Sequence, residues 1–70
     1  MSIVTQQYKN GVATITLNKP EMRNALSVEM FDVIERSLSE LNPDTRVVLL
    51  QGEGDVFCSG FDMKACTNDI

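Results

Sequence analysis

Apolar and polar residues alternate from Val12 to Leu17, directly after an Asn10-Gly11 pair. Asn-Gly tolerates the positive φ that both central residues of a type I′ turn require, so the pair predicts a hairpin with a two-residue loop. We expect strands over residues 2–9 and 12–18. The cross-strand pairs fixed by this loop are Tyr8 with Ala13, Gln6 with Ile15, and Val4 with Leu17. This register places an apolar set on one face and a threonine-rich set on the other.

A helical period follows over residues 28–41. Apolar side chains recur from just before this range to its end at steps of three and four, the pattern of a helix that packs against a sheet. They are Leu26, Met30, Val33, Ile34, Leu38 and Leu41. Ser27 is a good N-cap, and Glu29 in the first turn complements the helix dipole. Asn42-Pro43 ends the helix.

An unbroken apolar run from Val47 to Leu50 predicts a third strand. The lack of alternation indicates a strand that is covered on both faces and runs parallel to the strand at 12–18. Asp62 can cap a further helix through residues 63–65. The predicted class is α/β, with a β-hairpin, a helix, a parallel strand and the start of a second helix.

Composition narrows the classes of function. The 70 residues make at most one small domain, and ten acidic against six basic residues give a net charge of -4. Without a Lys or Arg cluster, we expect no nucleic-acid partner. The absence of a long apolar run argues against a membrane span, and residues 1–7 do not resemble a secretory signal, so we expect a cytoplasmic protein.

Two cysteines and no histidine give no usual zinc ligand set, so we expect no metal. Cys58 follows an apolar strand and loop, where a cysteine usually acts as a small buried hydrophobe rather than a reactive thiol. We expect Cys66 to be more exposed.

The glycine loop at Gly52-Glu53-Gly54 does not match a nucleotide-binding motif. The third glycine of a dinucleotide fingerprint would fall at Phe57, and no Gly-Lys-Ser or Gly-Lys-Thr follows. Ser59 is not a nucleophile elbow, because Phe57 stands two positions before it and the chain has no histidine. A tight loop that uses both glycines for positive φ is the better interpretation.

The stretch from Phe57 to Lys64 follows a strand and this glycine loop, at a junction that leads into a helix. Backbone amides at such a junction can hydrogen-bond an oxygen that gains negative charge during a reaction. Gly60 lets the chain approach that oxygen closely. The leading candidate donor is the amide of Phe61.

The segment Asn18–Ser27, followed later in the chain by this stretch, resembles the crotonase family of enoyl-CoA hydratases and isomerases. The resemblance implies an acyl-CoA thioester as the substrate, with coenzyme A as part of it and no separate cofactor. It implies that Arg23 contacts a phosphate and that Ala25 and Leu26 offer main-chain contacts to the pantetheine arm. From spacing alone, Arg23 could equally be a solvated charge.

The same resemblance makes the Phe61 amide one of two donors that polarise the thioester carbonyl. The substrate-binding residues that it implies nearby are Ser59, Gly60, Asp62 and Met63. Phe61 replaces the small residue of many hydratases, so its ring could wall the acyl pocket, although an ordinary core aromatic is an equal alternative. Asp62 is better interpreted as a helix cap, and Glu53 and Asp55 as solvated loop charges.

Domains of this family are several times longer than 70 residues. The resemblance therefore implies that residues 1–70 form a partial crotonase-like domain, truncated at its C-terminal end, without the family's acids and second oxyanion amide. Whether such a chain is itself an enzyme is uncertain from its sequence. The alternative is a non-catalytic fragment that serves as a structural or interaction module. The complete enzyme is expected to be a homo-oligomer.

Overall fold

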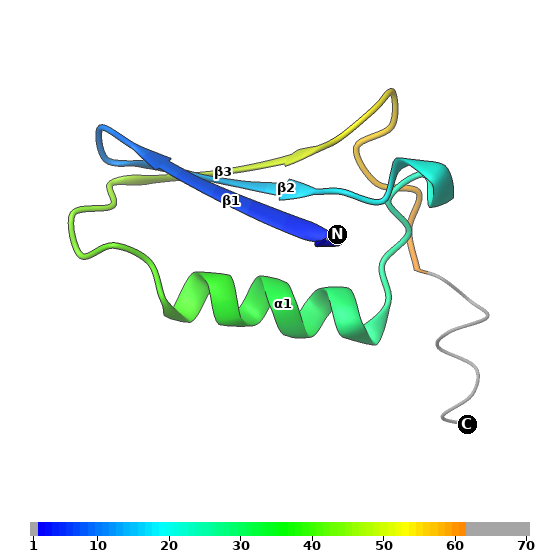
Figure 1. The fold of residues 1–70 in the computed structure, drawn as a ribbon, viewed down its shortest axis with the longest axis horizontal. Helices are drawn as coiled ribbons and strands as arrows, with labels where there is room; N and C mark the ends of the chain where they lie inside the picture. Colours follow the sequence, from blue (N-terminus) through cyan, green and yellow to red (C-terminus); the bar gives the residue numbers. More distant parts are fainter. Residues whose placement is uncertain (1, 62–70) are drawn as a thin grey trace.

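The computed structural model describes residues 2–61 as a three-stranded sheet lying over one helix (Figure 1). The sheet order is β1-β2-β3. The elements are β1 (Val4–Lys9), β2 (Val12–Leu17), a 3₁₀ turn η1 (Pro20–Met22), α1 (Val28–Ser39) and β3 (Val47–Gly52). This order confirms the predicted hairpin, helix and third strand. The second helix expected from Asp62, and Cys66, lie outside the described residues.

The hairpin has the predicted turn and register. Asn10 and Gly11 both have positive φ, of 52° and 81°. The three predicted cross-strand pairs are all present in the antiparallel β1–β2 ladder. The Gly11 carbonyl also accepts the Arg46 amide at 2.7 Å, which anchors the start of β3 beside the turn. β3 then runs parallel to β2, as predicted, from Val47 opposite Val12 to Gly52 opposite Leu17.

The core forms where α1 meets the hairpin. Val4, Ile15, Leu17 and Met30 make one buried cluster between the two layers. The helix begins as predicted, because the Ser27 hydroxyl accepts the Met30 amide at 3.2 Å. The core therefore brings the N-terminal half of α1 against the end of β2, next to the loop that joins them. No helix within residues 2–61 is long and apolar enough to cross a membrane.

Two expectations about burial are wrong in the described structure. Leu38 is 48% exposed. It belongs to the C-terminal half of α1, which lies toward the hairpin end of the sheet (Figure 1). Tyr8, near the hairpin turn, is also 39% exposed. β3 is exposed on both faces instead of covered: Val47 and Leu49 on one face are 54% and 48% exposed, and Val48 and Leu50 on the other are 43% and 44% exposed. The reason is that α1 packs closer to β1 than to β3, and no other described α-helix lies over the sheet.

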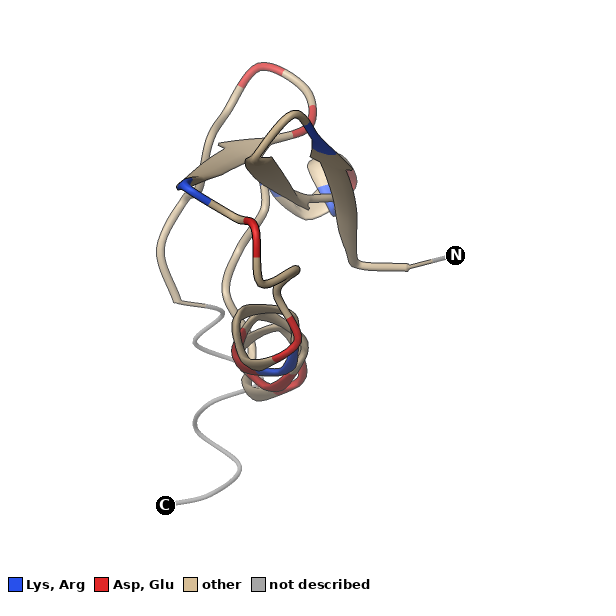
Figure 2. Cartoon of the chain, turned by 90° about the vertical axis from the view of Figure 1, so that its left-hand side faces the viewer, with Lys and Arg blue, Asp and Glu red and all other residues tan. Residues whose placement is uncertain are grey.

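Acidic residues are grouped on α1 and in the loop that follows β3, while Glu21 in η1 and Asp44 before β3 stand apart. Figure 2 shows the two groups. The second group consists of Glu53 and Asp55, which are both exposed. This loop leaves the sheet at the carboxyl end of β3, so its acids lie near the region that the sequence singled out.

Candidate functional site

Two loops leave the same end of the sheet, where β2 and β3 finish, and they lie side by side (Figure 1). The β2–α1 loop (residues 18–26) and the post-β3 loop (residues 53–61) follow the carboxyl ends of parallel neighbours, which is where ligand sites form in parallel sheets. The Ser59 amide donates to the Arg23 carbonyl at 3.0 Å, and the Leu26 amide donates to the Gly60 carbonyl at 2.7 Å. The two sequence segments that carry the candidate chemistry are thus joined by their backbones. We call this pair of hydrogen bonds, Ser59 to Arg23 and Leu26 to Gly60, the joint.

The direction of the Phe61 amide follows from this joint. The peptide between Gly60 and Phe61 is planar and trans, so its carbonyl and its N–H point in opposite directions. Because the Gly60 carbonyl points to Leu26, the Phe61 N–H points away from the β2–α1 loop. It has no backbone acceptor within residues 2–61. The two hydrogen bonds between the loops therefore do not use this amide.

The backbone conformation at position 60, and not a lack of space, favours glycine there. Its φ is 103°, a conformation that side chains rarely adopt, while a Cβ built on it would meet no atom within 4 Å. Ser59, on its N-terminal side, has an exposed side chain and uses its amide in the joint. Asp62 and Met63 lie outside the described residues.

The Phe61 ring is 61% exposed, so it is not a core aromatic in the described structure. It stands against Phe31 on α1, with ring centroids 5.7 Å apart and planes tilted by 42°. Beside this pair lies an apolar cavity of about 220 Å³ between α1 and the sheet. Its lining consists of Leu17, Leu26, Phe31, Ile34, Leu50, Phe57 and Cys58.

Cys58 packs as a small hydrophobe, as predicted, but it is only partly buried. It packs against the core cluster, and its sulfur accepts the Gly60 amide at 3.4 Å. It helps to shape the post-β3 loop beside the cavity.

Arg23 lies on the outer side of the β2–α1 loop. It is exposed and has a φ of 54°, which closes η1. Together with Glu53 and Asp55 it lines a surface hollow of about 510 Å³. An anion in this hollow would meet one guanidinium and, nearby, two carboxylates, so the acids reduce the positive potential that Arg23 offers.

Ala25 and Leu26 are half-buried, and their amides are already used. The Ala25 amide donates to the Met22 carbonyl at 3.1 Å, and the Leu26 amide makes the joint to Gly60. Their carbonyls accept no backbone hydrogen bond from any described residue. Leu26 also pairs with Phe61 in a short parallel bridge.

Asn24 is the residue that sequence reasoning missed. It is completely buried, and its side chain links the two loops. Its Oδ1 accepts the Lys19 amide at 2.8 Å, and its Nδ2 donates to the carbonyls of Glu53 and Val56 at 2.9 and 2.7 Å. Its sequence position gave one weak signal, since asparagine tolerates the left-handed backbone, but that signal suggests an exposed turn.

Gly52 makes room for this asparagine. A Cβ there would collide with the Phe57 carbonyl and lie 2.8 Å from Asn24 Nδ2. The prediction of positive φ is therefore wrong for Gly52, which is needed for close approach, and confirmed for Gly54, whose φ is 85°.

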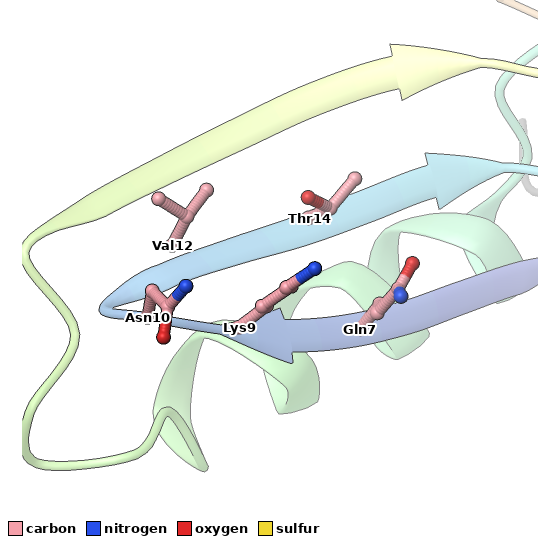
Figure 3. Close-up of a pocket in the computed structure, with 5 residues that line it drawn as sticks. All are labelled: Gln7, Lys9, Asn10, Val12 and Thr14. Atoms are coloured by element: carbon pink, nitrogen blue, oxygen red, sulfur yellow. The ribbon is translucent and has the colours of Figure 1, made fainter.

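A second hollow, of about 360 Å³, lies at the hairpin end of the sheet, away from the two loops. Figure 3 shows Gln7, Lys9, Asn10, Val12 and Thr14 around it, on the side of the sheet away from α1. It brings one cation and several neutral groups together without an acidic residue. No cluster of His, Cys, Asp and Glu within residues 2–61 could hold a metal ion.

Comparison with known proteins gives a consistent result. Residues 7–70 match the family model described as enoyl-CoA hydratase/isomerase. The chain is 42% identical over 55 residues to a Mycobacterium tuberculosis protein named enoyl-CoA hydratase EchA19, covering 76% of this chain and 21% of the relative. It is 34% identical over 70 residues to an Arabidopsis thaliana protein named peroxisomal Delta(3,5)-Delta(2,4)-dienoyl-CoA isomerase, covering 97% of this chain and 25% of that one.

Among solved structures, the crystal structure of an enoyl-CoA hydratase from Mycobacterium tuberculosis superimposes with a TM-score of 0.87 and 38% identity. The match covers 99% of this chain and 32% of the other. The chain thus spans about a quarter of the curated relatives that it matches and about a third of this structure.

Proposed function

Because the chain belongs to the enoyl-CoA hydratase/isomerase family, we propose that it forms the N-terminal, acyl-CoA-binding segment of such an enzyme. The observation that supports this most is the backbone joint between the two loops, which turns the Phe61 amide outward beside an apolar cavity. We favour this function over a non-catalytic interaction module, because the two relatives described above are named as a hydratase and an isomerase.

In the proposed role, the Phe61 N–H donates to the thioester carbonyl oxygen of the substrate. When a nucleophile or a proton shift generates an enolate, negative charge develops on that oxygen, and a fixed donor stabilises it more than it stabilises the ground state. The Phe61 ring and the cavity beside it would accommodate the acyl chain. Arg23 would contact a phosphate of coenzyme A, and the main chain of Ala25 and Leu26 would contact the pantetheine arm.

In this role the described residues would bind the substrate and polarise its carbonyl, but they place no acid–base pair beside the Phe61 amide. Glu53 and Asp55 are exposed and lie in the hollow of Arg23, not beside the Phe61 amide. Hydration of an enoyl thioester needs carboxylates that activate water and deliver a proton. We therefore expect catalysis only where further residues add these groups and a second oxyanion amide.

No cofactor beyond the coenzyme A of the substrate is expected in this role. Homo-oligomer formation by the complete enzyme and a cytoplasmic location stay predictions. The location needs a direct test, because the Arabidopsis relative is named as peroxisomal.

A chimera tests the proposal. Residues 2–61 replace the matched segment of the Mycobacterium tuberculosis enoyl-CoA hydratase, and hydration of crotonyl-CoA is followed. Phe61→Pro removes the amide proton and should lower kcat by about 100-fold or more, whereas Phe61→Ala keeps the amide and changes only the ring. Arg23→Ala should mainly raise KM, because a phosphate contact is the same in ground and transition states. Equal kcat values for Phe61→Pro and Phe61→Ala would refute the oxyanion role.

A further inference from the structure

The side chain of Asn24 connects backbone groups that are far apart in sequence. Its two donors go to carbonyls 29 and 32 positions later, and its acceptor takes an amide five positions earlier. From this geometry we infer that Asn24 is a positioning residue, which holds the β2–α1 loop and the post-β3 loop at a fixed separation.

The immediate neighbours of Asn24 show what it positions. Arg23 accepts the Ser59 amide, and Leu26 donates to the Gly60 carbonyl, so both backbone bonds of the joint flank Asn24 in sequence. If the asparagine side chain left its site, the carbonyls of Glu53 and Val56 would lose their donor. Leaving buried polar groups unpaired is costly, so the amide keeps the post-β3 loop in register with its partner.

Few side chains other than asparagine meet the demands of this position. Its φ is 56°, in the left-handed region that asparagine and aspartate tolerate better than other residues with a Cβ. Aspartate has the right shape but lacks the two N–H donors, and glycine has the backbone freedom but no amide. Gly52 leaves just enough space for the side chain, since its missing Cβ would lie 2.8 Å from Asn24 Nδ2.

The consequence for ligand binding rests on the function proposed above. Arg23 would hold the phosphate end of an acyl-CoA thioester, and the Phe61 amide would hold the carbonyl end. Both residues lie next to bonds of the joint, so Asn24 would set the distance between the two ends of the site without touching the substrate.

The first test uses the unaltered chain labelled with ¹⁵N. Both side-chain amide protons of Asn24 should exchange with water at least about tenfold more slowly than those of Asn10, whose side chain is exposed. Asn10 also has positive φ, so it is a matched reference. Equal exchange rates for the two side chains would overturn the inference, and this comparison requires no variant to fold.

The second test compares Asn24→Asp with Asn10→Asp, which adds the same charge at a second left-handed position. In Asn24→Asp the backbone amides of Leu26 and Ser59 should lose protection by about tenfold or more, while the Arg46 amide, bonded to Gly11, should keep it. Asn10→Asp should leave all of them unchanged. If the Arg46 amide lost protection to the same extent, Asn24 would stabilise the whole fold and not the two loops in particular, and the inference would be overturned.

Titration of the same samples with acetyl-CoA separates the two claims. Binding that weakens in Asn24→Asp but not in Asn10→Asp supports the positioning role in the proposed site. If the unaltered chain binds no acetyl-CoA, the proposed function fails, and the exchange rates alone decide whether Asn24 holds the loops.

Discussion

Replacing Met30 by alanine should remove the centre of the core. Met30 is completely buried between α1 and the sheet, in the cluster with Val4, Ile15 and Leu17. A substitution of this kind costs about 2–5 kcal/mol, through lost transfer free energy and the cavity that remains. A chain of 70 residues has a free energy of unfolding of roughly 4–10 kcal/mol at ~0.05–0.15 kcal/mol per residue. The variant should therefore lose a large part of its stability.

Leu38→Ala is the matched control on the same helix. Leu38 is 48% exposed, so its truncation removes about half of the burial that Met30 loses and should cost less than about 1.5 kcal/mol. The apolar period alone would place both residues in the core and predict similar costs. Urea unfolding followed by circular dichroism at 222 nm measures both values, provided that the slope with denaturant is unchanged. Equal losses for the two variants would refute the burial pattern described for α1.

Three further outcomes follow from the site. The isolated chain should hydrate crotonyl-CoA no faster than a blank, because the described residues lack an acid–base pair; turnover that purifies with the chain would contradict this. The double change Glu53→Gln and Asp55→Asn should tighten acetyl-CoA binding several-fold in low salt, with the gain shrinking in high salt, because it removes two negative charges beside Arg23; isothermal titration at two salt concentrations checks it. Gly52→Ala should lower the melting temperature by several degrees, because its Cβ would collide with the Phe57 carbonyl; an unchanged melt would show that the loops have room to shift.

Local sequence signals predicted much of the fold. The Asn10-Gly11 turn fixed the register of β1 and β2, and Ser27 capped α1 as expected, because each depends on groups a few residues apart. The parallel placement of β3 also followed from the chain. Its burial could not be predicted in the same way: an apolar run indicates that faces are apolar, but what lies over them depends on other layers.

The site was predicted only in part, for a similar reason. The two segments were identified by their residues, and the structure joins them through Arg23, Leu26, Ser59 and Gly60. The roles of Asn24 and Gly52 were not predicted, because they depend on contacts between positions almost 30 residues apart. A buried asparagine in a loop has no local pattern that distinguishes it from an exposed turn residue.

The amide of Phe61 offers the most direct test of the proposed site. A ¹⁵N-labelled chain is titrated with acetoacetyl-CoA, a thioester whose enolate places negative charge on the oxygen that the amide should bind. The account predicts that the Phe61 amide proton moves downfield and saturates together with the shifts of residues in the β2–α1 loop, and that Arg23→Ala weakens this binding. A Phe61 amide that stays unshifted while the ligand binds elsewhere on the chain would contradict it.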